Sequence, residues 1–254
     1  MAPTHNAIVD EQFGEQAQAY VSSTVHSSGP DLERVTRLSQ GWSGSTVLDL
    51  GCGGGHVSYA IAPHVAKVVA CDLSRSMLDA VAAEALRRGI PTIDTRQAAA
   101  EALPFADGSF DAATCRMSAH HWQDLDAGLR EAWRVLKRGS PAIFIDVVSP
   151  EDPILDTHLQ AVELLRDRSH VRDYRVTEWA AALGRAGFAI DRAVTHSLPM
   201  EFASWAARMR TPETLCSAIR TLQKEASQAV RNAFAIQDDG SFTIRVATFE
   251  LTAV

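Results

Sequence analysis

The sequence predicts an α/β fold in which helices cover both faces of a mostly parallel sheet. Short apolar runs rich in β-branched residues alternate with longer stretches of helical periodicity, the pattern of repeated β-α-β units. Glycine fills four of the five positions that follow the first apolar run. Glycine serves where the backbone must turn sharply or approach another group closely. These observations favour an open sheet with a ligand at the carboxyl ends of its strands.

The first unit spans the stretch TVLDLGCGGGHVSYAIAPHVAKVVACD. Residues 47–50 are too short and too apolar for anything but a buried strand, residues 56–62 resume a helical pattern, and residues 67–71 form a second buried strand. Each strand carries an acid at its carboxyl end, Asp49 and Asp72. The two acids and the glycine turn are therefore expected to line one crevice.

The turn does not fit the common phosphate-binding motifs. The dinucleotide pattern G-x-G-x-x-G has His56 at its third glycine position, and no Lys-Ser or Lys-Thr follows as in a P-loop. Asp49 would repel a pyrophosphate and attract a cation, while Asp72 is placed to accept hydrogen bonds from ribose hydroxyls. A nucleoside with a positive charge satisfies these conditions, and S-adenosylmethionine is such a molecule.

The pattern D-x-G-x-G-x-G from Asp49 to Gly55, followed by Asp72, resembles motif I and the next motif of class I S-adenosylmethionine-dependent methyltransferases. The segments 100–122 and 131–147 look like the ubiquinone/menaquinone-biosynthesis type of that superfamily. The similarity covers roughly residues 40–195 of this chain. It implies a Rossmann-like, seven-stranded, mostly parallel sheet in the order 3-2-1-4-5-7-6, with a helical lid.

The motif positions and their neighbours supply the expected cofactor-binding residues. These are Asp49, Gly51, Cys52, Gly53, Asp72, Leu73, Met77, Ala99, Ala100 and Arg116. Leu73 and Met77 flank the acid, where the resemblance implies an apolar shelf for adenine, although plain core packing is the alternative. At Ala99 the chain departs from the family, which has an aspartate there that accepts from the adenine amino group. That contact must come from the backbone or water, or be absent.

The remaining elements follow in order from their periodicity and their stop signals. Helices are expected at 75–88, 125–138 and 178–186, and strands at 91–98, 110–115, 142–148, 188–200 and 240–251. Each helix end coincides with glycine or proline. The near-continuous apolar character of 142–148 indicates a central strand.

Two divisions of the chain are expected: an N-terminal helical lid segment, 1–40, and a methyltransferase domain, 41–254. The domain carries helical insertions at about 150–176 and 203–236. Candidate residues on the lid and substrate side are Tyr20, His26, His170 and Arg172. The alternatives are an amphipathic helix that only packs on the sheet, and a charged face in contact with solvent.

The stretch that follows the strand at 110–115 is the densest chemical cluster in the chain. It contains the two catalytic candidates His120 and His121, because histidine titrates near neutral pH. Adjacent residues point in different directions, so one histidine can be catalytic while the other is structural. Arg116 could hold a substrate oxyanion, or pair with an acid such as Asp146.

Composition narrows the class of protein. The net charge of −7 argues against nucleic acid as a partner, and no signal sequence or membrane-spanning run is recognised. The cysteines are far apart and contain no CxxC pair, which gives neither a disulfide framework nor a metal site. They are Cys52, Cys71, Cys115 and Cys216. We expect a cytoplasmic protein, monomeric or homodimeric, that acts on a small molecule.

The expected function is transfer of a methyl group from S-adenosylmethionine to a small-molecule acceptor. The expected reaction is C- or O-methylation, with quinone-like and phenolic compounds as the candidate acceptors. Two alternatives stay open. One is an NAD(P)-dependent oxidoreductase, against which the missing third glycine counts. The other is a protein that binds S-adenosylmethionine without catalysis.

Overall fold

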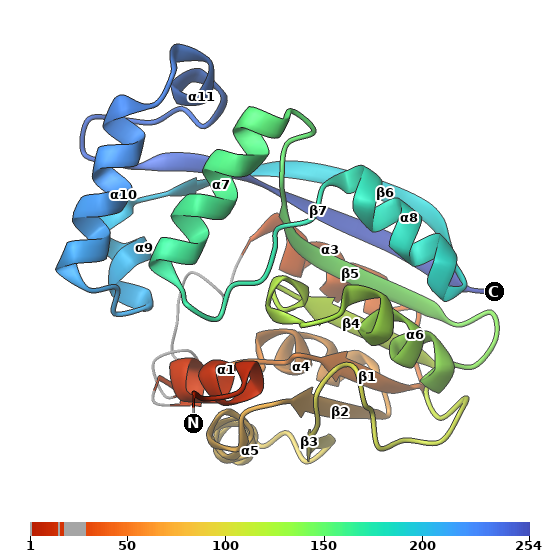
Figure 1. The fold of residues 1–254 in the computed structure, drawn as a ribbon. Coiled ribbons are helices and arrows are strands. Elements are labelled where there is room, and N and C mark those ends of the chain that lie inside the picture. Colours follow the sequence, from red (N-terminus) through yellow and green to blue (C-terminus); the bar gives the residue numbers. More distant parts are fainter. Residues whose placement is uncertain (1, 15, 18–28) are drawn as a thin grey trace.

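A seven-stranded sheet with helices on both faces forms the body of the protein (Figure 1). The computed structural model describes residues 2–14, 16–17 and 29–254. Within these residues the strand order is β3-β2-β1-β4-β5-β7-β6, and β7 alone runs antiparallel to its neighbours. The predicted fold class and strand order are therefore confirmed. The strands are β1 (Thr46–Leu50), β2 (Lys67–Asp72), β3 (Ile93–Gln97), β4 (Ala112–Arg116), β5 (Pro141–Val148), β6 (Phe188–Met200) and β7 (Phe242–Ala253).

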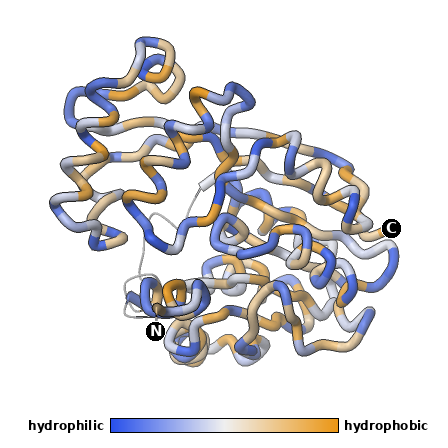
Figure 2. Tube along the Cα trace, viewed as in Figure 1, coloured by the Kyte–Doolittle hydropathy of each residue, from blue (hydrophilic) through white to orange (hydrophobic). Residues whose placement is uncertain are grey.

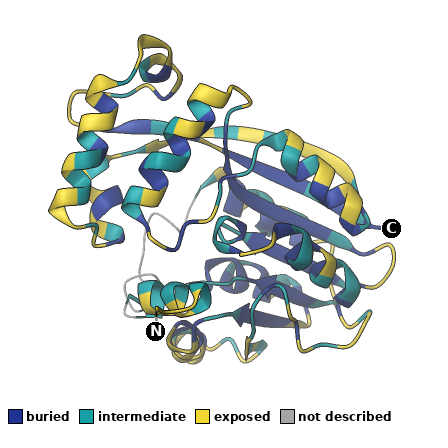
Figure 3. Ribbon diagram, viewed as in Figure 1, coloured by how far each residue is buried: buried dark blue, intermediate teal, exposed yellow. Residues whose placement is uncertain are grey.

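Alternation of side chains along the strands gives the sheet two apolar faces. Leu48 and Leu50 of β1 pack into one cluster with α6 (Leu125–Val135) and α8 (Val176–Ala186). Val47, one residue out of phase, packs on the opposite face. The helices on that face are α3 (Pro30–Ser39) and α4 (His56–Ile61), with α5 (Arg75–Arg87) packed beside them on β2. The buried residues concentrate in the central strands, and exposed residues line β6 (Figure 3).

A helical cap overhangs the carboxyl edge of the parallel strands, at the upper left of Figure 1. The cap consists of α7 (Pro153–Arg166), α9 (Phe202–Arg208), α10 (Glu213–Glu225) and α11 (Gln228–Ala233). Strand β5 ends opposite Arg245, whereas β6 and β7 stay paired as far as Met200 and Phe242. This overhang carries the separate apolar core of the cap, in which Trp205 is almost fully buried. Apolar and polar residues alternate along the cap helices (Figure 2), and buried apolar residues such as Ile219 and Val230 belong to the core of the cap.

The helical insertions differ in detail from the prediction. Residues 167–175 are not helical, because α7 ends at Arg166. The helical insertion expected at about 203–236 consists of three helices. Pro212 precedes α10, and Ser227 caps α11 by accepting from the backbone N–H of Val230. In the part of the chain that the structure describes, no helix is long and apolar enough to cross a bilayer.

The N-terminal helix α1 (His5–Gly14) lies beside α5 at the same edge of the sheet as the cap (Figure 1). It is joined to the cap side by Gln12, whose side-chain amide donates to the carbonyl of Met209 at 3.0 Å. Glu11 adds an ion pair with Arg168 at 2.8 Å. The segment therefore bridges the sheet domain and the cap. The lid candidates Tyr20 and His26 lie outside the described residues.

Candidate functional site

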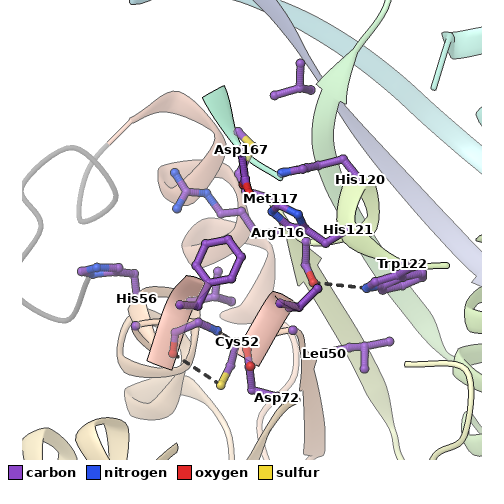
Figure 4. A pocket seen from close by; sticks show the side chains of 18 of the residues that line it. Leu50, Cys52, His56, Asp72, Arg116, Met117, His120, His121, Trp122 and Asp167 are labelled. Carbon is purple, nitrogen blue, oxygen red and sulfur yellow. Dashed lines mark hydrogen bonds between the residues drawn. The ribbon is translucent and has the colours of Figure 1, made fainter. Parts of the chain in front are cut away.

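A cavity of about 250 Å³ lies at the carboxyl edge of the sheet, between the glycine turn and the cap. Its lower half is lined by the turn, by Asp72 and by residues 98–101, and its upper half by residues of the cap and of the β6-β7 overhang. Helix α1 closes one side with Asn6, Val9 and Phe13. Figure 4 shows Asp72 and Cys52 at one end of the site, His120 and Asp167 at the other, and Arg116 and His121 between them.

The turn after β1 requires glycine at position 51. Gly51 has φ +66°, and a Cβ built on it would lie 1.9 Å from Oγ of Ser118. Gly53 has φ +48°, yet a Cβ there would meet no atom within 4 Å. Gly51 thus lets the end of β1 approach the segment after β4, while Gly53 borders open space. A backbone that borders open space without side chains is a cradle for a ligand.

Asp49 is tied to the protein on both of its oxygens. It accepts hydrogen bonds from the hydroxyls of Ser58 in α4, at 2.6 Å, and of Thr114 in β4, at 3.1 Å. Burial raises its pKa to about 6, although these hydrogen bonds act in the opposite direction. Asp49 lines the cavity, so its carboxyl can still attract a cationic ligand there, as the sequence predicts. In the structure, Asp49 links β1 to α4 and β4.

Asp72 closes the turn from the second strand. Its Oδ2 accepts from the backbone N–H of Gly53 at 2.8 Å, and its Oδ1 accepts from the N–H of Ser74 at 2.9 Å. Burial raises its pKa, against the effect of these backbone hydrogen bonds. Each carboxylate oxygen can accept a further hydrogen bond. Asp72 lines the cavity, so this carboxyl has the capacity to accept hydrogen bonds from the hydroxyl groups of a ligand.

The other predicted cofactor residues also border the cavity. They are Cys52, Leu73, Met77, Ala99, Ala100 and Arg116. Met77 is buried with Phe13 and Ala17 in a small apolar cluster. It therefore contributes to core packing, and its place on the cavity wall is also compatible with an apolar shelf for a base. Arg116 forms an ion pair with an acid, which was one of the two roles that we considered for it. The partner is Asp31 of α3, at 2.5 Å, and not Asp146.

The two histidines follow a strained residue. Met117 at the end of β4 has φ +54°, an uncommon conformation for a residue with a side chain. It turns the chain into the short 3-10 helix η2 (Ala119–His121), which crosses the cavity between its two halves. The rings of His120 and His121 lie 4.1 Å apart between centroids, and Phe13 of α1 contacts the His121 ring edge-on at 4.9 Å.

His120 is paired with Asp146 of β5. Its Nδ1 lies 2.5 Å from Oδ1 of Asp146, and its backbone N–H donates to Oδ2 of the same residue. Burial lowers the pKa of the imidazole, but the charge and hydrogen bond of Asp146, with the charges of Asp173 and Glu163, outweigh burial and raise the pKa to about 9. His120 is therefore a cation at neutral pH and does not act as a base there.

His121 has the opposite character. Burial and the charge of His120 lower its pKa to about 4, so the ring is neutral at pH 7. Its Nδ1 lies 3.1 Å from the carbonyl oxygen of Ser169, which can only accept, so Nδ1 carries the proton and Nε2 has the free lone pair. Of the two candidates, His121 has the protonation state that a base requires.

The non-helical stretch 167–175 positions the histidine pair. The backbone N–H groups of Val171 and Arg172 donate to the carbonyl of His120. The side chains of His170 and Arg172 do not line the cavity. His170 is bonded to Gln160, and Arg172 is paired with Asp156 and Glu178. The structure thus does not bring these two predicted side chains to the site.

Three acids at or beside the site were not predicted as site residues, although Asp146 was considered as a partner for Arg116. Asp146, Glu163 and Asp173 come from β5, from α7 and from the stretch after it, and all three are at least nine-tenths buried. For Asp146, the one signal in the sequence was a charged residue within a strand that is otherwise apolar. Among the described residues, no cluster of three or more His, Cys, Asp or Glu side chains has the geometry of a metal site.

Alanine at two turn positions should separate structural from ligand roles. We expect Gly51→Ala to destabilise the fold strongly, because its Cβ collides with Ser118, and Gly53→Ala to cost only the roughly 1–2 kcal/mol of left-handed strain. Gly53→Ala should nevertheless weaken binding of S-adenosylhomocysteine at least about tenfold, because its methyl group enters the cradle. Urea unfolding and calorimetric titration measure the two effects. Full affinity in Gly53→Ala would contradict the cradle.

The His120–Asp146 pair should make stability depend on pH. The folded pKa of about 9 lies above the ordinary 6.5, so its stabilisation is complete below pH 6.5 and is lost as the pH rises through 9. The loss should be on the order of 3 kcal/mol at most. In Asp146→Asn, the fall in unfolding free energy between pH 6.5 and 9 should disappear, and the His120 ring should titrate below pH 7 by NMR. An unchanged His120 titration in the variant would refute the pairing.

The comparisons with known proteins agree with this geometry. Residues 48–144 match the model of the methyltransferase domain family. YafE of Escherichia coli strain K12 is 51% identical over 189 residues, 74% of this chain and 91% of YafE. The methyltransferase YcgJ of Bacillus subtilis strain 168 is 34% identical over 224 residues, 88% of each chain. The crystal structure of YcgJ superposes with a TM-score of 0.84, at 32% identity, over 87% of this chain and 97% of that one.

A third relative is of the ubiquinone/menaquinone-biosynthesis type that the sequence motifs predicted. The ubiquinone/menaquinone biosynthesis C-methyltransferase UbiE of Rhizobium meliloti strain 1021 is 30% identical over 164 residues, 61% of this chain and 64% of UbiE. With the strand order and the glycine turn, these similarities decide against a nicotinamide-dependent oxidoreductase. The chain belongs to the class I methyltransferase family, as an S-adenosylmethionine-dependent methyltransferase of the UbiE-like type.

Proposed function

We propose that this protein methylates a small, largely apolar molecule bound between η2 and the cap. The observation that carries the proposal is the continuity of the cavity from the glycine turn, past the two histidines, to an apolar chamber under the cap. When bound, S-adenosylmethionine supplies a methyl group on a positively charged sulfur. The protein has to hold the acceptor in line with that methyl group and exclude water.

The lower half of the cavity suits the cofactor. The side-chain-free backbone at Gly53 lets an adenosine approach, and the Asp72 oxygens can accept from its ribose hydroxyls. The apolar side chains of Leu73 and Met77 can flank the base. Ala99 offers no side-chain acceptor to the adenine amino group, so the base is recognised through backbone or water.

The upper half suits the acceptor. Its walls include the apolar side chains of Val147, Leu198, Met200, Trp205 and Ile244. Helix α1 covers the remaining side, and its ties to the cap through Gln12 and Glu11 suit the predicted lid segment. Such a chamber excludes water from the acceptor, which strengthens every polar interaction inside it.

His121 is proposed as the group that takes a proton from the acceptor. Its Nε2 has the lone pair, and its Nδ1–H is fixed by the carbonyl of Ser169. His120 is proposed to act as a fixed cation, held by Asp146, that stabilises negative charge on the acceptor. A phenol, an enol or an activated carbon fits these two roles, and C-methylation is supported by the name of the UbiE relative.

Removal of the Asp72 carboxyl should weaken cofactor binding without abolishing the fold. We expect Asp72→Ala to reduce the affinity for S-adenosylmethionine by roughly 1.5–3 kcal/mol, as for hydrogen bonds to a charged group. Asp72→Asn should lose less, because an amide oxygen still accepts one backbone N–H. Calorimetric titration measures the affinities, with the exposed Asp79→Ala on α5 as the control. Unaltered affinity in Asp72→Ala would show that the ribose lies elsewhere.

The histidine roles predict different kinetic effects. With a panel of phenolic and enolisable acceptors, turnover is followed as formation of S-adenosylhomocysteine. His121→Ala should lower kcat by about 10²–10⁴, the usual contribution of general base catalysis, and should leave the cofactor affinity unchanged. His120→Gln should lower kcat and shift the pH dependence that His121 imposes to higher pH, because the charge of His120 lowers the pKa of His121. Near-normal turnover in His121→Ala would exclude it as the base, and no turnover of any acceptor by the wild-type protein would favour cofactor binding without catalysis.

A further inference from the structure

Two residues with buried carboxyl groups line the acceptor half of the cavity. Glu163 on α7 and Asp173 after it are 7% and 1% exposed, and both line the cavity. The nearest cation to Glu163 is Arg166, whose Nη1 lies 3.4 Å from Oε2. That separation is at the limit of a hydrogen bond.

The Asp173 carboxyl has one oxygen that no group in the described part of the protein satisfies. Its Oδ2 has no hydrogen-bond partner among the described residues. The side chain of Gln160 fixes the backbone of Asp173 on both sides, since its Oε1 accepts from the N–H at 3.0 Å and its Nε2 donates to the carbonyl at 2.8 Å. A buried polar group without a partner destabilises a fold, so a carboxyl fixed in this position suits a ligand.

The charges around this end of the cavity do not balance within the protein. Three acids line it, Glu163 from α7 and Asp167 and Asp173 from the stretch after α7. A fourth, Asp146 of β5, pairs with His120 there. Three cations lie with them, His120, Arg166 and Arg208 of α9, which leaves one negative charge in excess when all four acids are ionised. Burial raises the pKa of both Asp173 and Glu163, and the neighbouring acids add to this effect. Burial therefore favours the protonated form of both groups when the site has no ligand.

A ligand that carries one positive charge would correct the imbalance. It would pair with the Asp173 carboxylate and remove the need for a proton there. An alcohol could form a hydrogen bond at the same place but would leave the charge balance unchanged. The apolar walls of the chamber suit the remainder of the molecule.

We propose that Asp173, assisted by Glu163, anchors a protonated amine on an otherwise apolar methyl acceptor. The inference rests on the proposed function, in which the upper half of the cavity holds the acceptor. The amine is the anchoring group, and the atom that receives the methyl group lies toward His121. Binding converts the neutral Asp173 acid into a carboxylate, and its proton is released to solvent.

The test uses cyclohexylamine and cyclohexanol as probes of equal size. The full-length protein is first saturated with S-adenosylhomocysteine, which fills the cofactor half and carries no sulfonium charge to repel the amine. Calorimetric titration at pH 7 in two buffers of different ionisation enthalpy then gives affinity and proton release together. We expect the amine to bind at least about tenfold more tightly than the alcohol, with about one proton released per amine bound.

Matched variants locate the effect. Asp173→Asn should bind cyclohexylamine at least about tenfold more weakly and release no proton. Because Oδ2 of Asp173 has no partner to lose, the melting temperature of this variant should be equal or higher, whereas a purely structural aspartate would lower it. Asp79→Asn makes the same charge change at an exposed site on α5 and should behave as the wild type. Glu163→Gln should weaken amine binding less, and it replaces Asp173→Asn if that variant does not fold.

The outcomes separate this inference from the proposed function. Equal binding of alcohol and amine, amine binding without proton release, or full amine affinity in Asp173→Asn would each overturn the amine site. If S-adenosylhomocysteine binds and cyclohexylamine does not, only the amine site is refuted. If S-adenosylhomocysteine itself fails to bind, the proposed function falls.

Discussion

The architecture of the site depends on how closely the end of β1 approaches its neighbours. Ser118 occupies the volume where a Cβ of Gly51 would lie, so the turn and the segment after β4 fit together only with glycine at that position. Asp72 then fixes the turn by accepting from Gly53. Asp49 ties the same strand to α4 and β4. A few short contacts thus produce both the strand order and an open cradle at one edge of the sheet.

The second half of the site follows from the length of β6 and β7. Because these strands continue beyond β5, they carry an apolar cap over the carboxyl edge and enclose a chamber beside the cradle. The histidine pair lies at the boundary between the two halves. Its members differ in protonation because one has an acid partner and the other has a cation beside it. Burial alone lowers the pKa of both rings, so neighbouring charge determines their separate roles.

Much of the sheet domain could be predicted from sequence, because its signals are local. Apolar runs located the strands, and the glycine turn with Asp72 indicated the cofactor. The partners of charged residues were not predictable. Arg116 pairs with Asp31, which is distant in sequence, and Asp146 reaches His120 only because β4 and β5 are neighbours. Asp173 gave no signal, since its burial depends on the non-helical path after α7. The predicted roles of His170 and Arg172 depended on a helix that ends before them.

The central claim is that the cradle after β1 binds adenosine with its sulfur directed toward the histidines. A crystal structure with S-adenosylhomocysteine tests this claim most directly. The account predicts both ribose hydroxyls within hydrogen-bond distance of Asp72, the base beside Leu73 and Met77, and the sulfur facing the chamber that His121 borders. A ligand seated elsewhere, or a ribose held by residues other than Asp72, would contradict it.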